Sequence, residues 1–247
     1  MNMSKILHAW KSLIFVALPV FALPVQAASP GDSRPLKIGI IGTGNIGGAL
    51  ATHWAKAGHE LLISSRHPEE LKELAKSLGP NVRVGTPQEA AVFGDVILLS
   101  VPYSATPQIG RDLAKELKGK VVLDTGNPYP QRDGAMAEEA RRKGTGVSSA
   151  EFLPGVRLVR AFNAIAAGSL RNESNRAGER FAIPLAGNDA QALAIAQRLV
   201  LDAGFDPVVV GDLSRARQFD VGTAPYTKLQ SAASLRTELG LAAAPAK

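Results

Sequence analysis

Residues 38–50 read IGIIGTGNIGGAL, an apolar run that leads directly into three glycines spaced G-x-G-x-x-G. Gly42 permits a tight turn after a strand, Gly44 lets the backbone approach a pyrophosphate, and Gly47 lets the next helix pack close to the strand. The N-terminus of that helix offers free N–H groups and a positive dipole end to phosphates. The stretch therefore predicts a dinucleotide-binding loop. The expected contact residues are Gly42, Thr43, Gly44, Asn45, Ile46 and Gly47.

The remainder of the chain alternates apolar runs with helix-like segments, which predicts parallel strands joined by right-handed crossovers. The continuous apolar run over 95–101 is typical of a strand that is buried on both faces. We expect an α/β, Rossmann-type, doubly wound, mostly parallel sheet with a C-terminal α/β extension. Expected strands are 36–41, 60–64, 82–84, 95–101, 120–124, 156–162, 181–186 and 207–210. Expected helices are 45–57, 68–78, 87–93, 105–118, 131–143, 189–203 and 225–239.

The N-terminus has the layout of a secretory signal. Two lysines precede the apolar run 13–25, and Val25-Gln26-Ala27 offers a small-residue cleavage site. The run is shorter than the roughly 20 residues that a membrane-spanning helix needs. We expect cleavage after Ala27 and export to the periplasm; the alternative is an uncleaved signal that anchors the protein in the membrane. The predicted organisation is a signal over 1–27, a linker over 28–35 and a nucleotide-binding domain with its extension over 36–247.

The amino-acid composition argues against several classes of binding partner. The formal charge is +6, the basic residues are spread along the chain, and aromatic residues make up only 5%. A nucleic-acid binder more often gathers basic residues beside aromatic ones, so no nucleic acid is expected. The chain has no cysteine, which excludes disulfides and thiolate ligands. We expect a small-molecule or cofactor partner, no metal site, and membrane contact only through an uncleaved signal.

The residues at the end of the second expected strand indicate which of two dinucleotides, NAD or NADP, the protein binds. NAD-binding proteins usually place Asp or Glu there to bond the ribose 2′-hydroxyl. Here the chain reads Ser64-Ser65-Arg66-His67, with no carboxylate before Glu69. Hydroxyl groups and a forked guanidinium suit a 2′-phosphate, which a carboxylate would repel. The sequence predicts NADP (NADPH) as the cofactor, with Ser64, Ser65 and Arg66 in contact with it.

Later strand ends should line the same edge of the sheet, beyond the carboxyl ends of the strands. Val101 and Pro102 are expected to wall the cofactor, and Asn163 and Ile165 to face its nicotinamide; ordinary loop geometry is the alternative for each. No histidine follows position 67, so these loops lack a histidine acid. No catalytic residue is certain. The weak candidates for a proton donor are Tyr103 and Tyr129.

A longer pattern resembles a known family. IGTGNIGGALATHWAKAGHELLISSR resembles the opening of the NADPH:coenzyme F420 oxidoreductases and is similar to the oxidoreductase domain of the six-transmembrane metalloreductases. The resemblance continues in LLSVPYSA (98–105), VRAFNAIAAGSL (159–170) and most of 184–217. It implies an NADPH-dependent reductase that transfers hydride, and by the same resemblance the family's homodimer would carry over to this chain.

The resemblance also implies roles for particular positions. Thr43, Ser65 and Arg66 would hold the 2′-phosphate, and Asn163-Ala164-Ile165 would lie with Val101-Pro102 around the nicotinamide. The residues that would border the second substrate are Gly211, Asp212, Leu213 and Ser214. That acceptor would be a deazaflavin, a flavin-like ring or a metal chelate. Two alternatives stay open: a reductase of a small carbonyl or imine, and a non-catalytic nucleotide-binding protein of the envelope.

Overall fold

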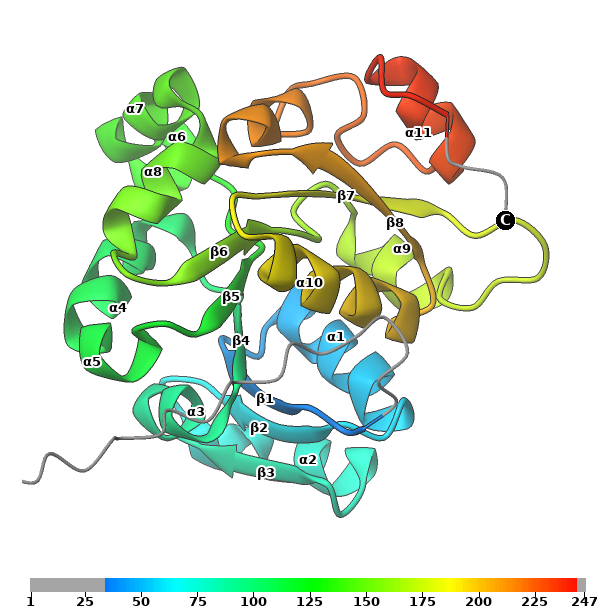
Figure 1. Ribbon diagram of the computed structural model, residues 1–247. Helices are drawn as coiled ribbons and strands as arrows, with labels where there is room; N and C mark the ends of the chain where they lie inside the picture. Colours follow the sequence, from blue (N-terminus) through cyan, green and yellow to red (C-terminus); the bar gives the residue numbers. More distant parts are fainter. Residues whose placement is uncertain (1–33, 244–247) are drawn as a thin grey trace, which may run out of the picture.

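A computed structural model describes residues 34–243 (Figure 1). Its centre is one eight-stranded sheet in the order β3-β2-β1-β4-β5-β6-β7-β8. The strands are β1 (Lys37–Ile41), β2 (Glu60–Ser64), β3 (Val82–Gly85), β4 (Val96–Leu99), β5 (Val121–Asp124), β6 (Arg157–Arg160), β7 (Ala182–Gly187) and β8 (Asp206–Gly211). The expected Rossmann-type α/β fold is confirmed.

The direction of the strands changes once across the sheet. Strands β1 to β6 are all parallel, and the order reverses between β1 and β4, which is where doubly wound folds bind ligands. Strand β7 runs antiparallel to β6, and β8 runs parallel to β7. The carboxyl ends of β7 and β8 therefore face the opposite edge of the sheet from those of β1 to β6.

Helices cover both faces of the sheet. The α-helices are α1 (Asn45–Lys56), α2 (Lys72–Leu78), α3 (Pro87–Phe93), α4 (Thr106–Asp112), α5 (Ala114–Leu117), α6 (Pro130–Asp133), α7 (Ala135–Lys143), α8 (Thr145–Phe152), α9 (Ala167–Asn172), α10 (Ala190–Asp202) and α11 (Ala232–Glu238). Short 3₁₀ turns are η1 (Pro68–Leu71), η2 (Tyr103–Ala105) and η3 (Leu213–Gln218). Among these helices, none is long and apolar enough to span a membrane.

Two apolar layers sandwich the sheet. One lies under α1 and α10, which cross in front of the sheet in Figure 1, and the other lies under α3, α5 and the end of α8. Trp54 of α1 is fully buried, meets Phe162 edge to face, and donates its indole N–H to the carbonyl of Leu199 at 2.9 Å. This contact ties the glycine-loop half of the sheet to α10.

Capping and glycine residues mark where several of the helices begin and end. Thr86 and Glu89 form a capping box at the start of α3. The Thr86 side chain accepts from the backbone N–H of Glu89, and the Glu89 carboxylate accepts from the backbone N–H of Thr86. Gly134 adopts φ of 65° and splits the single helix expected over 131–143. The helix expected over 225–239 is wrong in its first half, because only α11 forms and the preceding chain is irregular. That irregular segment, residues 219–231, returns across the edge of the sheet.

Candidate functional site

The glycine loop between β1 and α1 has the geometry of a phosphate-binding turn. Gly42 adopts φ of 97°, and a Cβ there would lie 2.3 Å from the carbonyl oxygen of Ser100. A Cβ on Gly47 would lie 2.1 Å from the carbonyl oxygen of Gly42. A Cβ on Gly44 would meet nothing within 4 Å. The chain itself thus requires glycine at the first and third positions, whereas the space above the second is open to a ligand.

The end of β2 holds this loop in place, and here one prediction is corrected. Ser64 is fully buried, and its hydroxyl donates to the carbonyl of Ile40 at 2.7 Å. Its own carbonyl accepts from the backbone N–H groups of Gly42 and Thr43 and from the Thr43 hydroxyl. The side chain of Ser64 therefore does not face a ligand, and the residue supports the loop instead.

Ser65 and Arg66 lie beyond the end of β2, on the surface. The Ser65 hydroxyl accepts from the backbone N–H of His67 at 2.9 Å and keeps its own proton free to donate. Arg66 is exposed, and within residues 34–243 its guanidinium forms no hydrogen bond or ion pair. Arg66 thus offers an exposed cation just after β2, the strand that pairs with β1.

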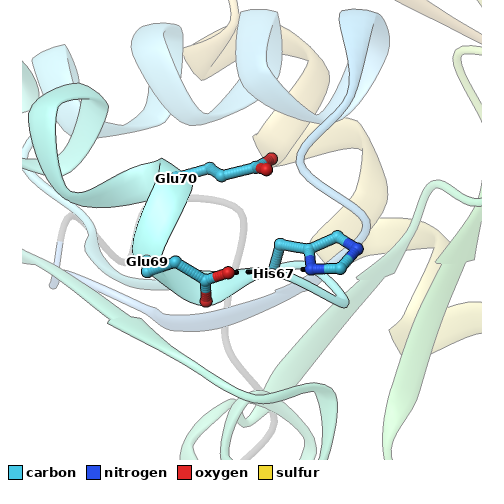
Figure 2. Close-up of side chains that lie close together, drawn as sticks. All are labelled: His67, Glu69 and Glu70. Carbon is cyan, nitrogen blue, oxygen red and sulfur yellow. Dashed lines mark ion pairs between the residues drawn. The ribbon is translucent and has the colours of Figure 1, made fainter.

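The next residues bring one imidazole and two carboxylates together. His67, Glu69 and Glu70 are all exposed, and their potential ligand atoms lie within 4.8 Å of one another. In Figure 2 the Glu69 carboxylate points to the imidazole of His67, and Glu70 extends separately above them. The His67–Glu69 pair is 3.6 Å apart and exposed on both sides, so solvent screens it. We assign no metal site to this surface group.

A cavity of about 580 Å³ opens at the carboxyl ends of the parallel strands, where the sheet order reverses. It runs from the start of α1 past the loops after β4 and β5 to the loop after β6. Its lining residues are Asn45, Ile46, Ser100, Val101, Pro102, Thr125, Gly126, Asn127, Tyr129, Arg132, Ile165, Ala166, Ala167, Tyr226 and Thr227.

Among the residues expected around a nicotinamide, the cavity includes Val101, Pro102 and Ile165. Asn163 does not line it. That side chain is buried and donates to the carbonyl of Phe219 at 3.3 Å, so it anchors the C-terminal segment. Ala164 is also buried and packs against Phe219. The turn starts with Phe162 at φ of 58°, a rare conformation for an aromatic residue that lets the chain reverse at the end of β6.

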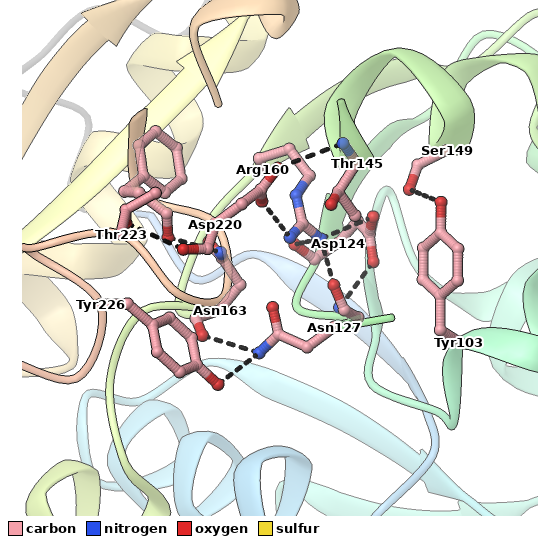
Figure 3. Close-up of polar contacts among 12 residues, drawn as sticks. Tyr103, Asp124, Asn127, Thr145, Ser149, Arg160, Asn163, Asp220, Thr223 and Tyr226 are labelled. Atoms are coloured by element: carbon pink, nitrogen blue, oxygen red, sulfur yellow. Dashed lines mark hydrogen bonds and ion pairs between the residues drawn. The ribbon is translucent and has the colours of Figure 1, made fainter. Parts of the chain in front are cut away.

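Tyr103 is not a proton donor to this cavity. Its side chain is fully buried, and its hydroxyl is 3.3 Å from the hydroxyl of Ser149 on α8. Figure 3 shows the ring turned toward α8. Burial raises the pKa of Tyr103 to about 12, although the hydrogen bond with Ser149 acts in the opposite direction. The sequence could not distinguish this core tyrosine from one in the site.

Tyr129 does line the cavity, and it meets a residue that the sequence analysis missed. Its hydroxyl lies 2.5 Å from that of Tyr226, and both side chains face the cavity. The amide of Asn127 bridges this pair to the loop after β6, because it donates to the Asn163 carbonyl at 2.8 Å and to the Tyr226 hydroxyl at 3.4 Å. Tyr226 comes from the irregular C-terminal segment, for which no sequence motif gave a signal.

A buried ionic network holds that segment beside the cavity (Figure 3). The fully buried guanidinium of Arg160 contacts Asp124 at 2.9 Å and Asp220 at 3.3 Å, and donates to the carbonyl of Gly126 at 2.6 Å. Asp220 also accepts from the backbone N–H of Thr145 at 3.1 Å. These bonds fix the start of the segment, so that Tyr226 reaches the cavity a few residues later.

The residues expected to border a second substrate lie elsewhere. Because β8 runs against β6, its end is at the opposite edge of the sheet, where the Leu213 N–H donates to the side chain of Asn188. Leu213 and Ser214 line a separate hollow that shares no residue with the large cavity. The structure therefore does not bring Gly211, Leu213 and Ser214 to the site.

Comparison with known proteins adds to this geometry. Residues 37–128 match the family described as NADP oxidoreductase, coenzyme F420-dependent. The chain is 35% identical over 125 residues to the F420-dependent NADP reductase of Methanocaldococcus jannaschii, which covers 42% of this chain and 56% of that protein. Over this part of the chain the protein is therefore similar to the coenzyme F420-dependent NADP oxidoreductases.

Two further similarities extend over most of this chain. Rat metalloreductase STEAP3 is 30% identical over 191 residues, which are 74% of this chain and 36% of that protein. A crystal structure of a hypothetical protein from Sinorhizobium meliloti superimposes with a TM-score of 0.67 and 26% identity, covering 81% of this chain and 96% of that one. The chain thus spans about a third of the metalloreductase and just over half of the archaeal reductase.

Proposed function

We propose that this protein is an NADPH-dependent reductase that transfers hydride from NADPH to an acceptor in the cavity at the sheet edge. One observation carries the proposal: a single cavity joins the start of α1, directly after the glycine loop, to the loops after β4, β5 and β6. A dinucleotide bound along this edge would have its pyrophosphate at the N-terminus of α1, and Val101, Pro102 and Ile165 would contact its nicotinamide. When bound, NADPH supplies the hydride.

The choice of NADPH over NADH rests on the end of β2. Thr43 and Ser65 present hydroxyl groups there, and Arg66 presents an exposed guanidinium without a partner in the described chain. A guanidinium pairs with a phosphate through two parallel hydrogen bonds, which makes it a strong 2′-phosphate ligand. The match of residues 37–128 to the NADP oxidoreductase family model supports the same choice.

For the acceptor we propose a redox cofactor, namely a deazaflavin or flavin-like ring, or a metal chelate. The names of the relatives, an F420-dependent NADP reductase and a metalloreductase, support these classes. The second candidate is a small carbonyl or imine compound, and the tyrosine hydroxyl groups in the cavity favour it, since such a substrate needs a proton at its oxygen or nitrogen.

Titration of the purified protein with NADPH and with NADH, followed by nucleotide fluorescence, tests the proposal. We expect saturable NADPH binding at least 10-fold tighter than NADH binding, because only NADPH has the 2′-phosphate. Binding of neither nucleotide would reject the reductase and favour a non-catalytic envelope protein.

We also propose that the protein acts outside the cytoplasm. The support is the lysine, apolar and small-residue pattern of residues 1–27, which lie outside the described residues. Cell fractionation with mass spectrometry of the N-terminus tests this proposal. A periplasmic chain that begins at Ala28 is expected. An intact N-terminus in the membrane fraction would indicate an anchor, and one in the cytoplasm would contradict export.

A further inference from the structure

The hydroxyl groups of Tyr129 and Tyr226 carry one more proton than their hydrogen bonds within the described chain require. Their hydroxyl oxygens share one hydrogen bond of 2.5 Å, in which either hydroxyl can be the donor. The one other contact of these hydroxyls in the described chain comes from the amide of Asn127, which donates to Tyr226 and accepts nothing from it. Two hydroxyl protons are thus present, and the shared bond uses one of them.

The second proton has no acceptor among residues 34–243. Whichever tyrosine donates to the other, the remaining O–H is a donor at a wall of the cavity that both side chains line. The same cavity also holds Ile165 and the Val101-Pro102 turn, which are the proposed neighbours of the nicotinamide. Both side chains are half-buried, so the donor faces the open cavity, and a ligand that displaces solvent there must offer it a lone pair in exchange.

We infer that Tyr129 and Tyr226 form the proton donor of the reaction, and that the acceptor is a compound with a C=O or C=N bond. The inference rests on the proposed NADPH-dependent reductase and narrows its acceptor. A ferric chelate takes up electrons without a proton at carbon-bound oxygen or nitrogen, so it has no use for this donor. Flavin-like and deazaflavin rings, quinones, aldehydes and imines all belong to the inferred class.

The inferred reaction combines hydride transfer from NADPH with proton transfer from the tyrosine pair. Hydride leaves C4 of NADPH, which becomes NADP⁺, and adds to the electrophilic atom of the acceptor: the carbon of an aldehyde, imine or deazaflavin, N5 of a flavin, or a carbonyl oxygen of a quinone. The displaced π electrons move to the oxygen or nitrogen at the other end of the conjugated system, which takes the proton of the free tyrosine hydroxyl. The other tyrosine passes its proton along the shared hydrogen bond, and solvent replaces it through the open cavity.

Several contacts hold the pair in this arrangement. The guanidinium of Arg132 lies 5.1 Å from the centre of the Tyr129 ring and donates to the Asn127 carbonyl at 2.7 Å. Next to Tyr226, the backbone N–H of Thr227 donates to the carbonyl of Ala164 at 2.9 Å. Burial, followed by the Tyr129 hydroxyl bond, raises the pKa of Tyr226 well above its usual value, so Tyr226 keeps its proton at neutral pH.

The test uses the full chain with NADPH and four probe acceptors: 9,10-phenanthrenequinone, a cyclic imine, riboflavin and ferric citrate. Tyr129→Phe, Tyr226→Phe and the double variant are compared with Tyr103→Phe as the matched control. Each single variant keeps one hydroxyl, so we expect kcat to fall about 10-fold or less. The double variant loses the donor, and kcat should fall by about 100-fold or more, with NADPH binding unchanged.

Two further readouts separate proton donation from a structural effect. The solvent deuterium isotope effect on kcat should be present in the native protein and in Tyr103→Phe, and should change in the double variant. Thermal melting of all variants shows whether they fold.

The outcomes are distinct. Reduction of ferric citrate alone, equal kcat in the native and double-variant proteins, or binding of NADPH without turnover of any probe would each overturn the inference, while the NADPH site would stand. Absence of NADPH binding would overturn the proposed function, and the inference with it.

Discussion

Gly44 and Gly47 show how one motif combines two separate requirements. A side chain on Gly47 would collide with the backbone of the turn, whereas the space over Gly44 is empty. Gly48, the next residue of α1, also has open space over it. The glycine at position 47 is thus required for folding, and the glycine at position 44 is required only if a ligand comes close.

Alanine substitutions at these three glycines should separate the two requirements. Gly47→Ala is expected to lower the free energy of unfolding by about 1–3 kcal/mol, because its Cβ overlaps a carbonyl oxygen. Gly44→Ala should change stability by less than about 1 kcal/mol but weaken NADPH binding at least 10-fold. Gly48→Ala, the control, should stabilise α1 slightly and leave binding unchanged. Urea unfolding and nucleotide titration check these outcomes; unchanged NADPH binding in Gly44→Ala would place the pyrophosphate elsewhere.

We expect Arg66 to determine the preference for NADPH over NADH. Since a charge-assisted hydrogen bond contributes about 1.5–3 kcal/mol, Arg66→Ala should weaken NADPH binding by about 10- to 100-fold and leave NADH binding nearly unchanged. Arg111→Ala on α4, an exposed arginine that bonds only Gln108, is the matched control. Equal weakening of both nucleotides by Arg66→Ala would contradict the 2′-phosphate contact.

At the scale of elements, the ends of β5 and β6 are joined to the C-terminal segment by one buried guanidinium. Arg160 is fully buried between Asp124 and Asp220, and it also bonds the carbonyl of Gly126 at the cavity. A buried charge is tolerated only when it is paired, so this network connects the cavity floor to the segment that carries Tyr226.

Removal of one partner of Arg160 should therefore be costly. Asp124→Asn is expected to lower the free energy of unfolding by about 3–5 kcal/mol, because it leaves Arg160 buried with part of its charge uncompensated. The matched control is Glu151→Gln, which breaks the exposed pair with Lys143 and should cost less than about 1 kcal/mol. Equilibrium urea denaturation measures both. A loss in Asp124→Asn no larger than in the control would show that the pair adds nothing to stability.

At the scale of the whole molecule, two carboxylates couple folding to pH. Burial alone would raise the pKa of Asp133, but Arg132 and the backbone N–H groups of Tyr129 and Ser104 lower it to about 2. The hydrogen bond from Arg157, followed by the N–H of Ala192, lowers the pKa of Asp189 to about 2.

Acid should remove the stability that these carboxylates provide. Because their pKa values are lower in the folded protein than in the unfolded chain, their contribution is complete above about pH 4 and is lost as the pH falls toward 2. We expect a lower free energy of unfolding at pH 3 than at pH 7, by about 1–2 kcal/mol from Asp133 and less from the partly exposed Asp189. The Asp133→Asn and Asp189→Asn double variant should show a smaller difference. An equal pH dependence in both proteins would contradict this assignment.

Short sequence motifs determined the nucleotide-binding half of this molecule. The G-x-G-x-x-G turn and the apolar strands were both predicted, because their causes act within a few residues. Only the tertiary structure decided the rest of the site. It showed Ser64 and Tyr103 to be buried, reversed β7 so that Gly211 and Leu213 face the far edge, and brought Tyr226 beside Tyr129. These outcomes depend on strand direction and on the buried Arg160 network, which join residues distant in sequence and leave no periodic or local pattern.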